Sequence, residues 1–160
     1  MKGIGSLLIL SAAGAAVLIY RREKVLRIRL LEELLAGLAL LRRGVCTERK
    51  PLPDIVKDEL GRHLAGEMLW LPLLEKMAMQ PIRGAWLDCT SALPDPLDRL
   101  LAPIGDFLPL GGNGLAGCIE EARTEIAALL GDERVELTER MKICAALCFS
   151  SAGLVILIFV

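Results

Sequence analysis

The sequence has few of the residues from which catalytic and metal sites are usually built. It holds one histidine, His63, and its five cysteines form no C-x-x-C pair and share no repeated spacing. It also lacks the G-x-x-x-x-G-K-[ST] loop with which many ATPases hold phosphate. We therefore expect no metal site, no bound cofactor, no small-molecule substrate and no catalytic activity. The thiols are expected to be free in a reducing cytoplasm.

Strand patterns and an excess of one charge are also missing. The alternating β-branched runs that are typical of strands do not occur. The formal net charge is −1, and every charged residue except Lys2 lies between residues 21 and 142. This balance excludes the basic surface that nucleic-acid binding requires, so no nucleic-acid partner is expected.

Apolar residues, by contrast, make up 54% of the chain, although only 4% of its residues are aromatic. Much of this excess lies in two segments without any charge: residues 3–20, GIGSLLILSAAGAAVLIY, and residues 143–160, ICAALCFSSAGLVILIFV. A helix of this length extends about 27 Å, close to the roughly 30 Å of a hydrocarbon core. Both segments are predicted to be transmembrane helices.

Basic residues flank both segments on the side that faces the middle of the chain. They are Arg21, Arg22, Lys24, Arg27, Arg29, Arg140 and Lys142. Because basic flanks stay on the cytoplasmic side of a membrane, residues 21–142 are predicted to be cytoplasmic and both chain ends to lie across the membrane. The alternative for residues 3–20 is a cleaved signal peptide, with Lys2 as its charged start and Ala12 to Ala16 as small residues for cleavage.

The middle region has the pattern of helices separated by proline and glycine. Apolar residues recur every three or four positions from Val25 to Leu41, so the first helix is predicted to leave the membrane and continue to Gly44. Prolines suited to helix starts follow at Pro53, Pro72, Pro81 and Pro96. A last helix has Ile119, Ala122, Ile126 and Leu129 at helical spacing and leads to the second membrane segment, with Gly131 as either a break or a weak point. The predicted fold is all-α: an antiparallel helical bundle over residues 21–142 with N- and C-terminal transmembrane helices.

The stretch GNGLAG, Gly112 to Gly117, matches the G-x-G-x-x-G spacing of dinucleotide-binding loops. Such a loop requires a preceding strand, whereas the residues before it, DFLPL, contain a proline and resemble the end of a helix. We therefore interpret Gly111, Gly112 and Gly114 as a structural turn between two helices, where glycine permits a left-handed backbone.

Other candidate residues have both a functional and a structural interpretation. His63 lacks the nucleophile-elbow pattern of a hydrolase, so a structural histidine is favoured over a catalytic one. Carboxylates at helical spacing from arginine, as in Glu136 and Arg140, indicate solvated and partly paired helix faces. Trp70 is either a core residue or part of an exposed apolar groove. With Glu75 and Lys76, it makes up the candidate partner surface.

Taken in order, several segments resemble the stage III sporulation protein AB family of endospore-forming bacteria. They are the membrane anchor that runs into LLEELLAGLALLRRG, then PLPDIVKDEL, EKMAMQPIRGAW and IGDFLPLGG, and the C-terminal membrane helix. The helical domain of that family is similar to the platform protein of type II secretion systems.

The resemblance implies a mother-cell membrane protein that faces the forespore. Its cytoplasmic bundle would be a platform or adaptor for a secretion-type ATPase and for other membrane subunits of the complex that connects the two cells. The alternatives from other classes are a small membrane-anchored enzyme that uses His63, a cysteine or the glycine turn, and a regulatory subunit of a transporter.

Overall fold

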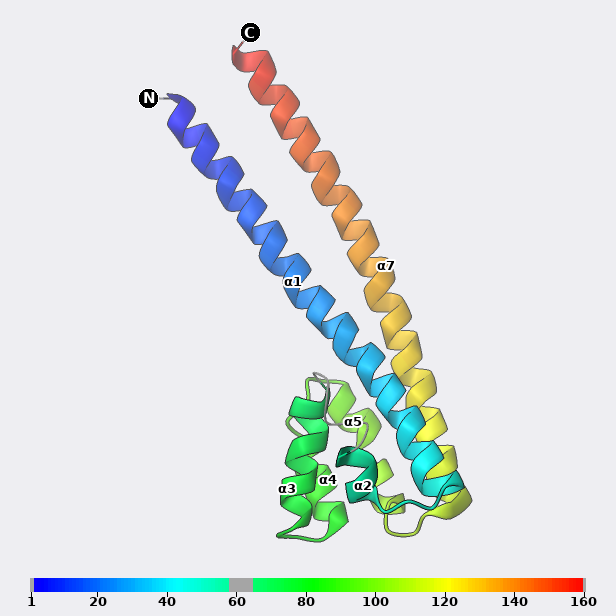
Figure 1. Cartoon of the computed structure of the whole chain (residues 1–160). Coiled ribbons are helices and arrows are strands. Elements are labelled where there is room, and N and C mark those ends of the chain that lie inside the picture. Colours follow the sequence, from blue (N-terminus) through cyan, green and yellow to red (C-terminus); the bar gives the residue numbers. More distant parts are fainter. Residues whose placement is uncertain (1, 58–64, 160) are drawn as a thin grey trace. The chain divides into compact units, whose positions relative to one another are not determined.

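The structure is a computed structural model that describes residues 2–57 and 65–159, with side chains described only between residues 15 and 151. Every regular element in this part of the chain is helical, which confirms the predicted all-α fold. The α-helices are α1 (Lys2–Arg42), α2 (Leu52–Ile55), α3 (Leu71–Met77), α4 (Ile82–Thr90), α5 (Leu97–Leu101), α6 (Ile104–Phe107) and α7 (Gly112–Phe159). Two π-helical turns, η1 (Arg43–Thr47) and η3 (Gly66–Trp70), complete the described elements (Figure 1).

The chain divides into two compact units. Unit 1 consists of residues 1–28 and 131–160, and unit 2 consists of residues 29–130. Unit 1 therefore pairs the first part of α1 with the last part of α7. Unit 2 contains all the shorter helices and the remaining parts of the two long ones. The predicted membrane segments belong to unit 1, and most side chains of residues 3–20 and 143–160 lie outside the described ones.

Among the residues that the structure describes, no helix has a stretch both long enough and apolar enough to cross a membrane.

The core of unit 2 is built on two helical stripes that the sequence pattern predicts. From α1 it includes Leu34, Leu38 and Leu41, each of them fully buried. From α7 it includes four residues at steps of three or four: Leu115, Ile119, Ala122 and Ile126. Residues at this spacing lie on one side of a helix, so each long helix presents one apolar face to the core.

A pair of tryptophans occupies the middle of unit 2. The rings of Trp70 and Trp86 lie 5.9 Å apart at an angle of 56° and are almost completely buried. The Trp86 indole N–H donates a hydrogen bond of 2.7 Å to the Leu101 carbonyl, which ties α4 to α5. Gly105 of α6 lies against the same indole, and a Cβ there would come within 2.7 Å of Trp86 Cδ1. A residue without a side chain is therefore required at this position.

The glycine stretch forms a turn between α6 and α7, as predicted, with no strand before it. Gly111 and Gly112 have φ values of 60° and 72°, a region that glycine adopts at little cost. The Gly111 N–H donates to the Phe107 carbonyl at 2.9 Å and closes the end of α6. Gly114 differs from the prediction because α7 already begins at Gly112. It lies in the first helical turn, where a Cβ would crowd the Phe107 ring at 3.2 Å.

Two sequence expectations concern the start of α5 and the length of α7. Pro96 directly precedes α5, which begins at Leu97 without a side-chain cap, and the Asp95 carboxylate pairs with Arg99 at 3.3 Å. Gly131 does not break α7, which continues from Gly112 to Phe159.

Gly131→Ala is expected to stabilise α7 by about 0.5–1 kcal/mol, because alanine has a much higher helix propensity and a Cβ at this site meets no atom within 4 Å. Thermal unfolding followed by circular dichroism measures the change. The matched control is Gly112→Ala on the same helix, where positive φ makes a side chain unfavourable and a loss of about 1–2 kcal/mol is expected. An equal effect of both substitutions would contradict the assignment.

Candidate functional site: a charge clasp between two long helices

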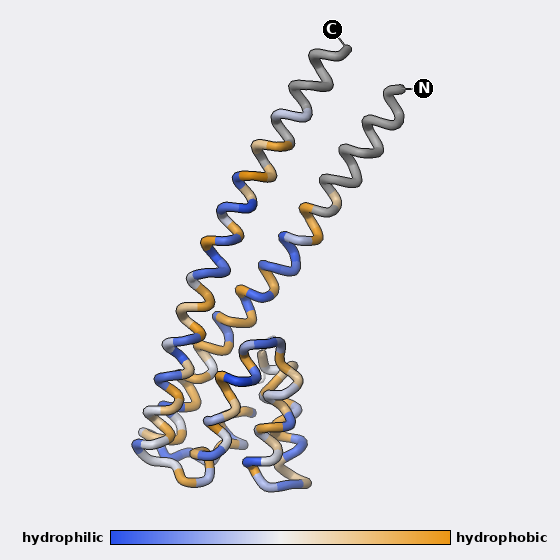
Figure 2. The backbone as a smooth tube through the Cα atoms, turned by 180° about the vertical axis from the view of Figure 1, so that it is seen from behind, coloured by the Kyte–Doolittle hydropathy of each residue, from blue (hydrophilic) through white to orange (hydrophobic). Residues whose placement is uncertain are grey.

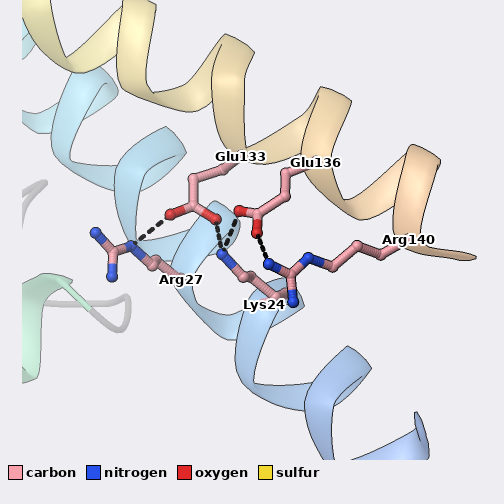
Figure 3. A network of polar contacts seen from close by, with 5 residues as sticks. All are labelled: Lys24, Arg27, Glu133, Glu136 and Arg140. Carbon is pink, nitrogen blue, oxygen red and sulfur yellow. Dashed lines mark hydrogen bonds and ion pairs between the residues drawn. The ribbon is translucent and has the colours of Figure 1, made fainter.

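Five charged side chains of unit 1 form a connected cluster, which we call the charge clasp. It consists of Lys24 and Arg27 from α1 and Glu133, Glu136 and Arg140 from α7 (Figure 3). Their spacings of three and four residues bring each set to one face of its helix. The charge clasp therefore joins two segments that are more than 100 residues apart in the sequence.

The distances in the charge clasp are those of direct, charge-assisted hydrogen bonds. The Lys24 Nζ donates to Glu133 at 2.6 Å and to Glu136 at 2.7 Å, so one ammonium connects two carboxylates. Glu133 also pairs with the Arg27 guanidinium at 2.9 Å, and Glu136 with that of Arg140 at 2.9 Å. The Glu133 side chain is 13% exposed and that of Glu136 is 38% exposed, which makes Glu133 the more shielded carboxylate.

The electrostatics of the charge clasp favour its charged forms. The hydrogen bonds that the Lys24 ammonium donates to Glu133 and then to Glu136 raise its pKa above the ordinary value of 10.5. The hydrogen bond from Lys24 is the largest cause that lowers the pKa of Glu136 below its ordinary value of 4.5. Lys24 and Glu136 are therefore held in their charged forms at neutral pH, as their ion pair requires.

Tyr20 extends the charge clasp by one helical turn towards the uncharged end of α1. Its ring lies beneath the Arg140 guanidinium, 5.3 Å from the ring centroid, and 6.0 Å from the Lys24 ammonium. Cations at such distances are attracted to the negative face of an aromatic ring. The chain's only tyrosine therefore helps to position Arg140.

The pH dependence of the charge clasp follows from these shifts. Lys24 has a raised pKa, so its contribution to pairing is complete below pH 10.5 and is lost as the pH rises above that value. Glu136 has a lowered pKa, so its contribution is complete above pH 4.5 and is lost as the pH falls below it. Spin labels at Arg22 and Glu139, both exposed in unit 1, are expected to give a distance distribution that broadens outside this window. The same breadth at pH 3 as at pH 7 would contradict the prediction.

Sequence reasoning found one part of the charge clasp and missed the rest. The Glu136–Arg140 pair within α7 follows from its spacing and is confirmed. A second pair at helical spacing on α7 joins Arg123 to Glu120 at 2.9 Å, three residues earlier. The contacts from α1 to α7 leave no local pattern, since they depend on the register of two distant helices.

The predicted partner surface is only partly exposed. Trp70 does not lie in an exposed groove: it is 1% exposed because its ring packs on Trp86 in the core of unit 2. Glu75 is exposed on α3, and Lys76 next to it is partly exposed and lies 3.9 Å from the Asp88 carboxylate. Met79, which follows α3, is 91% exposed and extends the surface that these two residues begin.

The remaining candidate residues, the histidine and the cysteines, do not form a metal site in the described part of the chain. His63 lies outside the described residues. Cys46, Cys89, Cys118 and Cys144 are free thiols, as the sequence predicts. Burial raises the pKa of Cys89 and of Cys118, which reduces the share of reactive thiolate. Across residues 2–57 and 65–159, no group of three histidine, cysteine or acidic side chains is arranged to hold a metal ion.

The charge clasp lies in the charged stretches that follow the first uncharged segment and precede the second one. Figure 2 shows hydrophilic residues at short intervals on both helices next to their grey ends. The fold and this site define an all-α protein in which two long helices of one unit are joined by ion pairs. No protein-family model, curated protein or solved structure matches the chain.

Proposed function

We propose that the protein is a membrane-anchored platform or adaptor subunit of a sporulation-specific, secretion-like complex that connects mother cell and forespore. In this proposal residues 3–20 and 143–160 anchor the chain in the mother-cell membrane, and residues 21–142 form the cytoplasmic part. A secretion-type ATPase and other membrane subunits of the complex bind to it. The family resemblance of the sequence supplies the particular complex.

The observation that carries this proposal is the charge clasp. It pairs α1 with α7 in antiparallel orientation, directly next to the uncharged segment of each helix. Lys24 lies against Glu133 and Glu136. A hairpin of this kind presents two apolar helices to a bilayer together, with their charged flanks on one side. A soluble enzyme has no need for two uncharged 18-residue segments aligned in this way.

Unit 2 supplies the part that an adaptor requires, a stable body with a distinctive surface. Its core is closed around Trp70 and Trp86, whose side chains are almost completely buried. On its surface, Glu75, Lys76 and Met79 follow one another along α3 and the turn after it, and Met79 is almost fully exposed. The exposed Met79 is the residue of this surface most suited to contact another protein, because methionine is enriched at interfaces and adapts its shape to a partner.

Membrane attachment is tested by fractionating cells that express the full chain. The protein is expected to remain in the membrane pellet after carbonate extraction, and a protease added to the cytoplasmic side is expected to cleave within residues 21–142. Replacing Leu154 and Leu157 by arginine adds two charges to the second segment and is expected to release that end from the membrane. Full recovery of the unaltered chain in the carbonate supernatant would refute the proposal.

Partner binding is tested with the full chain in detergent and a purified secretion-type ATPase. Saturable binding is expected, and Met79→Arg is expected to weaken it at least about tenfold, since a buried apolar contact is replaced by an unpaired charge. The matched control is Leu110→Arg, a similarly exposed apolar residue near the turn before α7, which is expected to leave binding unchanged. Binding of ATP or NAD to the chain itself, measured by calorimetry, would favour an enzyme instead.

A further inference from the structure

A groove of about 470 Å³ lies on unit 1, one helical turn from the charge clasp on the side of the uncharged segments. Its walls are Val17 and Tyr20 from α1 and Arg140, Ile143 and Cys144 from α7. Each set has the spacing of a single helix face, so the groove runs between the two paired helices.

The lining changes from charged to apolar along the groove. At one end the Arg140 guanidinium lies above the Tyr20 ring at 5.3 Å, next to the charge clasp. One turn further along both helices, the walls become Val17 and Ile143, and Ile143 is 58% exposed. A cation and an aromatic ring at one end and apolar walls beyond them match the two halves of a phospholipid.

Arg140 has the geometry to bind a phosphate while it keeps its present contacts. Its ion pair with Glu136 uses one terminal nitrogen, and a guanidinium carries five N–H donors in a planar fork. The side chain is 57% exposed, so the other edge of the fork is accessible. The Tyr20 ring, whose centroid lies 5.3 Å from the guanidinium, restricts the side chain, which lowers the entropy lost when a phosphate binds.

Local charge favours an anionic ligand over a zwitterionic one. Arg21 and Arg22 follow Tyr20 directly and are both exposed. Each basic side chain close to a bilayer attracts anionic headgroups by about 1 kcal/mol. Basic pockets between membrane helices on the cytoplasmic side are a general setting for such headgroups.

We propose that this groove binds an anionic phospholipid, with its headgroup phosphate on Arg140 and the first part of an acyl chain against Val17 and Ile143. This inference rests on the proposed membrane attachment, which places the groove at the depth of the headgroups. It goes beyond that attachment because it assigns a specific lipid site to five side chains.

The test uses the full chain reconstituted in phosphatidylcholine vesicles with a trace of phosphatidylglycerol that carries a photoactivatable acyl chain. After illumination, labelled peptides are mapped by mass spectrometry. Saturable labelling at or next to Ile143 is expected. Unlabelled phosphatidylglycerol is expected to compete, whereas added phosphatidylcholine and inorganic phosphate are expected not to.

Arg140→Gln is expected to lower the labelling about fivefold, as the loss of one cation at the headgroup predicts. The control is Lys142→Gln, which removes an exposed charge two residues further along α7 but outside the groove, and it is expected to lower labelling less than Arg140→Gln does, because Lys142 does not line the groove. Arg140→Lys keeps the positive charge but loses the planar guanidinium, so labelling is expected to lie between that of the unaltered chain and that of Arg140→Gln. Equal helix content by circular dichroism shows that the variants are folded.

The outcomes separate the lipid site from the membrane attachment. A chain that incorporates into vesicles but is labelled equally in the Arg140→Gln and Lys142→Gln variants overturns the lipid site alone. Competition by inorganic phosphate also overturns it, because the site would then recognise the anion without the lipid. A chain that stays in the aqueous fraction overturns the attachment and the lipid site together.

Discussion

Replacing Trp86 by alanine is expected to lower the free energy of unfolding of unit 2 by about 3–5 kcal/mol. The side chain is fully buried against Trp70, and its removal leaves a cavity that the neighbouring helices close only in part. It also leaves the buried Leu101 carbonyl without the indole N–H that donates to it at 2.7 Å. Denaturant unfolding of the full chain in detergent, followed by circular dichroism, measures the loss.

Two further variants divide this effect into its causes. Trp86→Phe retains a large ring but removes the hydrogen bond, and a loss of about 1–3 kcal/mol is expected. Gly105→Ala keeps the indole but places a Cβ against it, and overpacking of this kind costs about 1–3 kcal/mol. Gly117→Ala is the control, since a Cβ there meets no atom within 4 Å. A Gly105→Ala variant as stable as Gly117→Ala would show that the helices around Trp86 are not packed as described.

Reversing the charge of Glu133 is expected to weaken the pairing of α1 with α7 in unit 1 by about 2 kcal/mol. Glu133→Lys breaks the ion pairs with Lys24 and Arg27 and places a third cation between them. Because the native carboxylate is only 13% exposed, solvent screens this repulsion less than it would at an open surface. Amide hydrogen exchange of residues 20–28 and 131–141 is expected to become about 30-fold faster.

A neutral variant and a distant variant complete the comparison. Glu133→Gln removes the ion pairs without adding a cation, and about half of the effect is expected. Glu139→Lys makes the same change of charge on the same helix at an exposed position outside the charge clasp. It is expected to leave the amide exchange rates of these residues within a factor of about two of those of the unaltered chain, because surface substitutions usually have small effects. Equal acceleration by Glu139→Lys and Glu133→Lys would show that net charge, and not the charge clasp, controls the pairing.

The sequence was sufficient to predict those features of the fold that depend on local chemistry. Apolar residues at helical spacing identified the buried faces of α1 and α7, including Leu34 and Ile126. The glycine pair Gly111 and Gly112 was predicted as a turn because its neighbours excluded a strand, and both residues have the positive φ that such a turn requires. In each case the deciding interaction lies within a few residues along the chain.

Features that depend on tertiary packing could not be predicted in the same way. Trp70 is compatible with a core or with an exposed groove until its contact with Trp86, 16 residues later, is known. Lys24 has no acidic partner that α1 alone would specify, and its two carboxylates lie on α7. Basic residues next to an apolar segment indicate membrane topology whether or not they pair with carboxylates of another helix. The sequence therefore does not show that Lys24 and Arg27 are paired.

The placement of the aromatic side chains gives each unit its own natural optical reporter. Both tryptophans of the chain are buried in unit 2, where their emission is shielded from water, whereas the single tyrosine belongs to unit 1 and lies beneath Arg140. Tryptophan fluorescence therefore follows the unfolding of unit 2 alone. Tyrosine absorbance follows the surroundings of the groove, so lipid addition and core unfolding can be monitored separately in one unlabelled sample.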